Sequence, residues 1–282
     1  MINIPSFAII GTKKSGKTTI TEALISNFVK DGLKVVAIKN VHEGSLAFTP
    51  NLKDSWRLFQ AGAVMAIAIS PNELELLKRI GANEKKLEIL FKLIQEEFDV
   101  VFLEGFKELV LEREDIAKIL VIKNLEEAYE FLKNSKNIIA ITGELDKSSI
   151  ENLASFQIPI FNYKKDINVL IYLVKKHYNR LSLVFKTMNE LPLLNCGHCG
   201  YKNCFEFAKA IVDKVRAKDD CFILKQEEKV QVKILGKKLP LHPFVQDFIR
   251  KTVLGMLSSL KHVEIKGDEN ITITLTNSKF KN

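Results

Sequence analysis

A glycine-rich segment near the start of the chain places the strongest constraint on the fold. Residues 11–18 are GTKKSGKT, which fits the pattern G-x-x-x-x-G-K-[ST], and they directly follow the apolar run Phe7–Ile10. A helical apolar pattern begins at Thr18 and ends at Asp31-Gly32. A strand, a glycine loop and a helix in this order are typical of a phosphate-binding P-loop, because the loop amides and the helix N-terminus point at one anion. The sequence therefore predicts a P-loop at the first strand–helix turn.

Each residue type in this loop suits a separate task at a bound nucleotide. Gly11 and Gly16 allow the backbone to wrap closely around a phosphate. Lys17 is predicted to reach the β and γ phosphates, and the Thr18 hydroxyl to ligate Mg²⁺. Thr19 is placed to hydrogen-bond the α phosphate. The alternative is a glycine-bearing turn that holds no ligand.

A carboxylate for the metal is expected at the end of a second buried strand. The run Val100–Leu103 is wholly apolar and is followed by Glu104 and Gly105. Since ligands bind at the carboxyl ends of strands in parallel sheets, Glu104 is predicted to hold Mg²⁺ or orient water. Gly105 offers a backbone N–H to the γ phosphate. The alternative for Glu104 is an ordinary carboxylate at a strand end.

The residues alone do not identify the base of the nucleotide. The guanine-reading motif N-K-x-D is absent, and Asp146, shortly after the apolar run Ile138–Thr142, is a candidate for reading a base edge. ATP and GTP both stay open at this point. The segment 39–57 carries side chains that suit a second anionic substrate or a solvated surface equally well: Lys39, His42, Lys53, Asp54 and Arg57.

Apolar strands alternate with helical patterns through residues 1–178. Strands are expected at 7–10, 34–38, 64–69, 100–103, 119–122, 138–142 and 158–161, and helices at 18–30, 52–61, 84–98, 126–133 and 167–178. Apolar strands separated by helices form a mostly parallel sheet that is covered on both faces. We therefore predict an α/β P-loop NTPase fold for residues 1–178.

All four cysteines of the chain lie in one short segment. Cys196, Cys199, Cys204 and Cys221 have the spacing C-x2-C-x4-C-x16-C. Thiolates are the ligands that iron–sulfur clusters select, and four of them complete a [4Fe–4S] cubane. Structural zinc is the alternative, although zinc sites more often pair two C-x2-C units. His198 lies between two of the cysteines and is interpreted as a bystander.

The cysteines define a small helical module at residues 181–224. The apolar pattern lapses over Leu181–Leu194, and a helix is expected from Cys204 to about Lys218, which returns Cys221 to the cluster. Residues 228–282 are predicted to form a small α+β unit whose role the sequence does not identify. It comprises a strand–turn–strand around Gly236, an amphipathic helix at 244–260, and a hairpin across residues 267–268. The apolar face of that helix is interpreted as the core of the unit, with a partner-docking face as the alternative.

Composition excludes several other classes of protein. Lys and Arg number 42 against 34 Asp and Glu, a formal charge of +8 that is scattered along the chain. This pattern favours a solvated, lysine-rich surface or a surface for anionic ligands, and no aromatic-interleaved basic motif indicates nucleic acid. No uncharged stretch reaches the roughly 18–20 residues of a membrane span, and no signal peptide is recognisable. We expect a cytoplasmic protein without a membrane partner.

Several segments, taken in order, resemble the molybdopterin-guanine dinucleotide biosynthesis protein B (MobB) family. They are the P-loop with Thr19, the strand end Ile38-Lys39, residues 53–57 running into 61–63, and Glu104-Gly105-Phe106-Lys107. The resemblance covers about residues 5–178. One departure is that the histidine–aspartate-rich loop of the family is reduced here to residues 42–44, HEG.

This resemblance implies a homodimeric GTP-binding accessory protein with weak GTPase activity. Such proteins assist a MobA-like guanylyltransferase that joins GMP to molybdopterin, on behalf of a molybdenum or tungsten enzyme. Lys17 and Glu104 are then the residues for phosphoryl transfer to water. The match assigns nucleotide binding to Lys14, Ser15, Gly16, Lys17, Thr18 and Glu104.

The cysteine segment resembles the small [4Fe–4S] domain of Rnf-complex B subunits and corrinoid iron–sulfur proteins. The similarity spans about Leu181–Leu224, includes Leu191-Pro192, and implies cluster-ligand roles for all four cysteines. An alternative function is therefore a nucleotide-gated carrier that delivers electrons or a cluster to a partner metalloenzyme. That reading is disfavoured by Thr12, where iron-protein-type ATPases have a lysine. A small-molecule kinase would need an acceptor motif that the sequence lacks.

Overall fold

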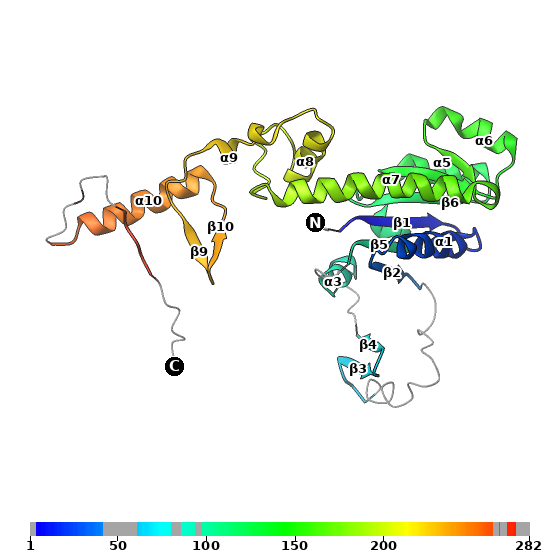
Figure 1. Cartoon of the computed structure of the whole chain (residues 1–282), viewed down its shortest axis with the longest axis horizontal. Coiled ribbons are helices and arrows are strands. Elements are labelled where there is room, and N and C mark those ends of the chain that lie inside the picture. Colours follow the sequence, from blue (N-terminus) through cyan, green and yellow to red (C-terminus); the bar gives the residue numbers. More distant parts are fainter. Residues whose placement is uncertain are drawn as a thin grey trace. The chain divides into compact units, whose positions relative to one another are not determined.

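The structure is a computed structural model that describes residues 4–41, 61–79, 86–93, 98–261, 265 and 270–274 (Figure 1). The chain divides into two compact units, Met1–Ser182 and Leu183–Asn282. The finer division into 1–178, 181–224 and 228–282 stays a prediction. No helix in the described ranges is both long enough and apolar enough to cross a membrane.

A six-stranded parallel sheet with the order β2-β5-β1-β6-β7-β8 forms the centre of the first unit (Figure 1). Its central strand β1, which leads into the P-loop, pairs with β5 and β6, so that Ile9 lies opposite Glu104 and Gly11 opposite Val121. The predicted α/β fold with a mostly parallel sheet is confirmed. The strands are β1 Ser6–Gly11, β2 Val35–Lys39, β5 Val100–Glu104, β6 Ala117–Ile122, β7 Ile138–Gly143 and β8 Ile160–Asn162.

Helices cover both faces of this sheet, because successive side chains of a strand point to opposite faces. On one face, Phe28 of α1 (Lys17–Lys30) packs edge-on against Phe102, with ring centroids 5.2 Å apart. On the other, Phe131 of α5 (Leu125–Asn134) joins Ala8 and Ile10 in one buried cluster. Shorter elements complete the covering layers: α3 Lys86–Leu93, α4 Lys107–Val110, α6 Lys147–Leu153 and the 3₁₀ turn η2 Ala154–Phe156.

A separate antiparallel hairpin differs from the prediction. β3 (Met65–Ile69) pairs with β4 (Leu74–Lys78) in its own two-stranded sheet. The chain reverses at Ser70, whose hydroxyl accepts the N–H of Glu73 at 3.0 Å. The expectation that residues 64–69 join the main sheet is therefore wrong, and β4 was not predicted. The expected helix at 52–61 lies outside the described residues, as do His42, Lys53, Asp54 and Arg57.

Helix α7 (Tyr163–Asn189) continues into residues 181–189, where the sequence predicted an irregular segment without a helical apolar pattern. Val184, Phe185 and Met188 are buried on one face of it, at the spacing of a helix. The expectation of an irregular segment at 181–194 is therefore wrong up to Asn189, because this apolar spacing was overlooked. The boundary between the two units falls inside this helix.

The second unit is mostly helical. Its elements are α8 Cys204–Val212, η3 Lys218–Asp220, α9 Phe222–Lys225, β9 Val232–Ile234, β10 Lys237–Leu239 and α10 Pro243–Ser258. The β9–β10 hairpin around Gly236 and the presence of helix α10 match their predictions. The interpretation of the apolar face of α10 as a core is wrong, since Phe244 and Phe248 are exposed. The expected C-terminal hairpin does not: residues 270–274 form no strand, and most of the remainder lies outside the described residues.

Helix α8 is shorter than expected. Lys214 adopts a left-handed φ of 59°, and the N–H of Val215 bonds to the carbonyl of Ala210 at 2.9 Å. This arrangement closes the helix with a Schellman motif. The predicted continuation of one helix to Lys218 is therefore wrong, and a turn followed by the 3₁₀ helix η3 leads to Cys221.

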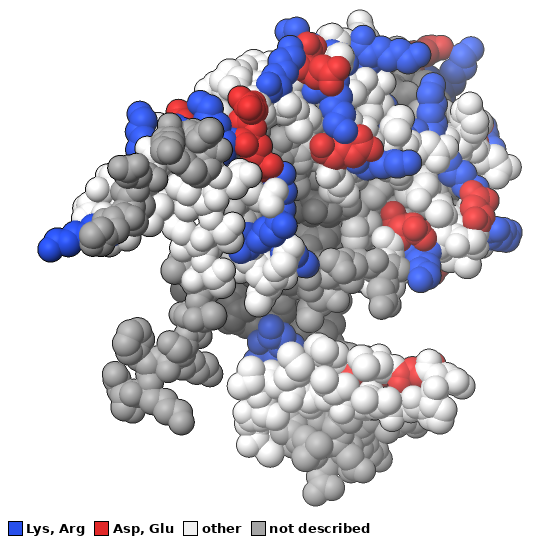
Figure 2. All heavy atoms as spheres, turned by 60° about the vertical axis from the view of Figure 1, so that its left-hand side comes forward, with Lys and Arg blue, Asp and Glu red and all other residues white. Residues whose placement is uncertain are grey.

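Charged side chains of both signs are interspersed on the face shown in Figure 2. Exposed ion pairs of the first unit include Lys107–Glu130 and Lys136–Glu114, both 3.1 Å. Pairs of this kind contribute little to stability, because water screens them. The choice between a solvated surface and a surface for anionic ligands stays a prediction.

One lysine is an exception, because Lys118 on β6 is fully buried. Its ammonium donates to the carbonyls of Arg113, Ile116 and Lys136 at 2.5, 3.0 and 2.6 Å. Replacing Lys118 with Met leaves these carbonyls without their donor. We therefore expect a loss of about 2–4 kcal/mol in unfolding free energy, measured by urea titration at pH 7.

The pH dependence of stability gives a second readout for Lys118. Burial lowers the pKa of its ammonium from 10.5 to about 8. The unfolded chain thus binds more protons between these pH values, and wild-type stability gains from this group as pH rises from 8 to 10.5. The Lys118→Met variant should lack this gain. Substitution of the exposed Lys136 by Met serves as the control. Equal stability of the two variants would contradict the stabilising role of the buried Lys118 ammonium.

Candidate functional site

The P-loop joins β1 to α1 and depends on glycine at two points. A Cβ on Gly11 would lie 2.0 Å from the Val121 carbonyl oxygen, so β6 leaves no space for a side chain. Gly16 has a left-handed φ of 97°, and a Cβ there would lie 2.8 Å from the Tyr163 hydroxyl oxygen. Both positions therefore require glycine. Gly11 is required because the backbone of β6 approaches it closely, and Gly16 because of both the close approach of Tyr163 and its left-handed backbone conformation.

A buried hydroxyl in this loop fits an anion. Ser15 is 6% exposed, and its Oγ has no hydrogen-bond partner within the described parts of the chain. A buried hydroxyl without a partner is costly, and a phosphate oxygen would supply the missing acceptor. The loop is therefore chemically suited to a phosphate group.

The side chains predicted for metal and phosphate binding converge beside this loop. Thr18 Oγ1 donates to Glu104 Oε1 at 2.9 Å, and Lys39 Nζ lies 3.0 Å from the same carboxylate oxygen. Lys17 Nζ folds back onto the carbonyl oxygen of Thr12. The end of β5 thus brings Glu104 to the first turn of α1, as the sequence predicts.

Burial and charge both act on the P-loop lysine. Desolvation lowers the pKa of Lys17, Glu104 opposes this shift, and the neighbouring Lys123 and Lys39 reinforce it. Two further ammonium groups therefore act on that of Lys17 at this edge of the sheet. Their positive potential favours an anionic ligand.

An open cleft of about 600 Å³ connects these residues. It is lined by Lys13, Lys14, Ser15, Gly16, Lys17, Thr18, Thr19, Lys39, Asn40, Val41, Glu104 and Gly105. Every P-loop residue assigned from the sequence lines it, except Gly11, which packs against the Val121 carbonyl of β6. Asn40 and Val41 were not singled out. Their position in the sequence could have identified them, because they directly follow the end of β2, where Lys39 pairs with Glu104.

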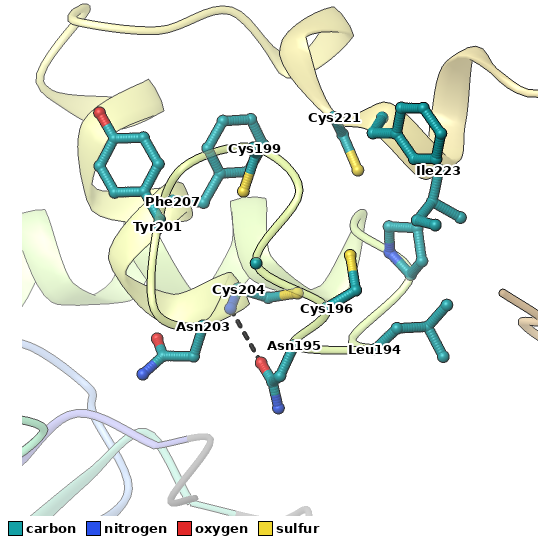
Figure 3. A pocket seen from close by; sticks show the side chains of 13 residues that line it. Leu194, Asn195, Cys196, Cys199, Tyr201, Asn203, Cys204, Phe207, Cys221 and Ile223 are labelled. Carbon is teal, nitrogen blue, oxygen red and sulfur yellow. Dashed lines mark hydrogen bonds between the residues drawn. The ribbon is translucent and has the colours of Figure 1, made fainter.

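The four thiols of the second unit face one common space (Figure 3). Cys196, Cys199, Cys204 and Cys221 all line the same pocket, with Pro192, Leu194, Tyr201, Phe207, Phe222 and Ile223 among the other residues around it. Cys221 is buried, and the other three are half-buried. Soft sulfur donors in a largely apolar enclosure are suited to an iron–sulfur cluster.

Local hydrogen bonds fix the loop that carries these thiols. Asn195 Oδ1 accepts the N–H of Cys204 at 2.8 Å (Figure 3). Gly197 and Gly200 have φ values of 76° and 85°, which only glycine adopts readily. Asn195 was not singled out from the sequence, although an asparagine beside a cysteine ligand is a usable signal.

Burial and the neighbouring cysteines both act on the thiol of Cys204. Burial raises the pKa of Cys204, and the three other cysteines raise it further. Within the described residues, no three His, Cys, Asp or Glu side chains form a group that could hold a single metal ion. The four thiols thus border a shared pocket and do not converge on one point.

His198 takes no part in lining the pocket. Its ring stacks on Phe222, with centroids 4.9 Å apart, and lies 5.1 Å from the ring of His242. Its Nδ1 lies 3.2 Å from the Cys196 carbonyl oxygen. These contacts agree with the interpretation of His198 as a bystander to the thiols.

Two family models match the chain. The model for "Molybdopterin guanine dinucleotide synthesis protein B" matches residues 6–144, and the model for "Putative Fe-S cluster" matches residues 191–223. A Methanocaldococcus jannaschii protein described as "Putative molybdopterin-guanine dinucleotide biosynthesis adapter protein" is 30% identical over 274 residues, which cover 97% of this chain and 98% of that one. The Haemophilus influenzae molybdopterin-guanine dinucleotide biosynthesis adapter protein is 30% identical over 123 residues, covering 42% and 63%.

Solved structures with similarity to the chain carry related titles. A crystal structure of molybdopterin-guanine biosynthesis protein B has a TM-score of 0.47 and 22% identity, and covers 62% of this chain and 99% of that one. The crystal structure of Bacillus subtilis MobB has a TM-score of 0.47 and 23% identity, with coverages of 60% and 98%.

Proposed function

Because the chain belongs to the molybdopterin-guanine dinucleotide biosynthesis protein B family, we propose that it binds GTP with Mg²⁺ and carries a [4Fe–4S] cluster. In this proposal it is an adapter in the biosynthesis of the molybdopterin, or tungstopterin, guanine dinucleotide cofactor. The observation that carries the nucleotide part is the convergence of Thr18 and Glu104 beside the buried, unpartnered hydroxyl of Ser15.

Each side chain has a definite task in the proposed nucleotide site. The loop amides and Ser15 hold the phosphates, and Lys17 neutralises charge on the β and γ groups. Thr18 and Glu104 hold the magnesium ion, which supplies further charge neutralisation when bound. Glu104 Oε1 is already bonded to Thr18 and Lys39, and this proposal assigns the carboxylate to the metal site. The weak GTPase activity is carried over from the family resemblance.

The cysteine pocket supports the second part of the proposal. Four thiols of suitable chemistry face one space, enclosed by apolar side chains. Such an enclosure limits access of water to a cluster and affects its reduction potential. The cluster would be held by Cys196, Cys199, Cys204 and Cys221.

The partners follow from the family. A MobA-like guanylyltransferase would receive help from the nucleotide-bound protein, and the finished cofactor would pass to a molybdenum or tungsten enzyme. The homodimeric state and the cytoplasmic location stay predictions.

A reconstituted reaction tests this role. The full-length protein is added to a MobA-like guanylyltransferase, molybdopterin, Mg·GTP and an apo-molybdoenzyme, and the activity of the loaded enzyme is measured. Wild-type protein should raise the yield of active enzyme, whereas a Lys17→Ala variant should not. Equal yields with and without the wild-type protein would contradict the adapter role.

Substitution of Glu104 by Gln tests the metal assignment. Its loss of charge should weaken Mg·GTP binding by roughly 10- to 100-fold, since hydrogen bonds and contacts of a charged group contribute about 1.5–3 kcal/mol. Calorimetric titrations with excess Mg²⁺ and with EDTA should show that the difference is confined to the Mg²⁺ samples. A difference of the same size in EDTA would exclude Glu104 as a metal ligand.

A further inference from the structure

The geometry of the P-loop sets the direction in which a nucleotide must extend. Lys17, Thr18 and Glu104 mark the end that holds the β and γ phosphates, and Glu104 belongs to β5. In the sheet, β1 lies between β5 and β6. The α phosphate and the nucleoside therefore extend away from β5, toward the carboxyl ends of β6, β7 and β8.

A polar cluster lies on that side, in contact with the P-loop. The Tyr163 ring is so close to Gly16 that an added Cβ would meet it at 2.8–3.1 Å. The Tyr163 hydroxyl donates to Glu144 Oε1 at 3.1 Å, and Lys164 Nζ lies 2.8 Å from Glu144 Oε2. Tyr163 thus connects the phosphate loop to an exposed carboxylate.

The two loops that supply this cluster are joined to each other. Gly143, the last residue of β7, pairs with Asn162, the last residue of β8. The Asn162 amide donates to the carbonyl of Leu145 at 2.7 Å, and its Oδ1 accepts the N–H of Lys164 at 3.1 Å. Backbone pairing and one asparagine therefore hold Glu144 and Lys164 in a fixed relation.

The nearby Asp146, which the sequence suggested as a reader of the base, already has a structural task. Its Oδ1 accepts the N–H of Ser149 at 2.9 Å and caps helix α6. Among the described residues, the partners of Glu144 are the side chains of Tyr163 and Lys164. Because a carboxylate has about four lone-pair sites, two partners leave it able to accept more hydrogen bonds.

We propose that Glu144 reads the Watson–Crick edge of guanine, with Tyr163 beside the base and Lys164 positioning the carboxylate. This inference rests on the proposed function, since it needs a nucleotide in the P-loop. Guanine presents two donors, N1–H and the 2-amino group, which match the two oxygens of a carboxylate. Adenine presents an acceptor at N1, which a carboxylate repels. The cluster therefore selects GTP over ATP.

An exchange of specificity tests this proposal. In xanthine, an oxygen replaces the 2-amino group of guanine, so that a glutamine amide can donate where the glutamate could only accept. We expect Glu144→Gln to bind Mg·GTP roughly 5- to 150-fold more weakly, the discrimination typical of one bidentate pair, and to bind Mg·XTP more tightly than the wild type does. Calorimetry of the full chain with Mg·GTP, Mg·XTP and Mg·ATP gives all three affinities.

The control is Glu130→Gln, which alters a comparable exposed glutamate in an ion pair with Lys107. It should leave all three affinities unchanged. An unchanged ratio of GTP to XTP affinity in Glu144→Gln, or a wild-type preference for ATP, would overturn the assignment of Glu144 alone. Absence of binding of any nucleotide to the wild type would overturn the proposed function and this inference together.

Discussion

Replacing Lys17 with alanine is expected to lower the affinity for Mg·GTP by roughly 30- to 4,000-fold. This range corresponds to about 2–5 kcal/mol, the cost of removing one partner of a desolvated charge pair. Lys17 is the P-loop ammonium whose pKa is lowered by burial, so a phosphate would be a strongly preferred partner for it. Isothermal calorimetry of the full chain measures the change directly.

A second lysine on the same helix provides the control for this experiment. Lys30 lies exposed at the far end of α1, and Lys30→Ala should retain the wild-type affinity. The melting temperature of the Lys17 variant should stay near that of the wild type, because Lys17 donates within the loop only to the Thr12 carbonyl. An affinity unchanged by Lys17→Ala would exclude this loop as the phosphate site.

Replacing Cys221 with serine is expected to remove the cluster. Protein purified without oxygen should carry about four iron atoms per chain and absorb broadly in the visible range. In Cys221→Ser both signals should fall to a small fraction, since a serine hydroxyl is a poor substitute for a thiolate and Cys221 is the one thiol of the pocket that is supplied after η3. Iron analysis and visible spectroscopy measure the loss.

His198→Ala is the matched variant for the cysteine site. His198 lies in the same loop and stacks on Phe222, but His198 itself does not line the pocket. This variant should therefore keep its iron and its colour. If both variants lose their iron, the conformation of the loop, and not the fourth thiol, determines whether the protein retains iron. A colourless wild-type protein containing zinc would contradict the cluster assignment.

Sequence reasoning placed the P-loop and Glu104 because both depend on local patterns. A glycine motif between a strand and a helix, and a carboxylate after four buried residues, retain their meaning without knowledge of the tertiary structure. The same is true of the spacing of the cysteines, which predicts one common site for the four thiols, although the path of the chain to Cys221 was predicted wrongly. The conformation of these loops also follows from the sequence, since Gly16, Gly197 and Gly200 all have left-handed φ values.

Other features depend on which segments become neighbours, which a single sequence does not specify. The separate sheet of β3 and β4 follows from a reversal at Ser70, and nothing in the apolar run 65–69 distinguishes it from a strand of the main sheet. The Glu144 cluster depends on β7 and β8 ending side by side and on Tyr163 meeting Gly16. Strand order brings Tyr163 to Gly16, which lies more than a hundred positions earlier in the chain.

If the amide-lined loop of the first unit holds a guanine nucleotide, a calorimetric titration of the wild-type full chain with Mg·GTP should show saturable binding at one site per chain. Mg·ATP should bind more weakly in the same experiment. A titration with Mg·GTP up to millimolar concentration that shows no saturable binding would exclude this loop as a guanine-nucleotide site.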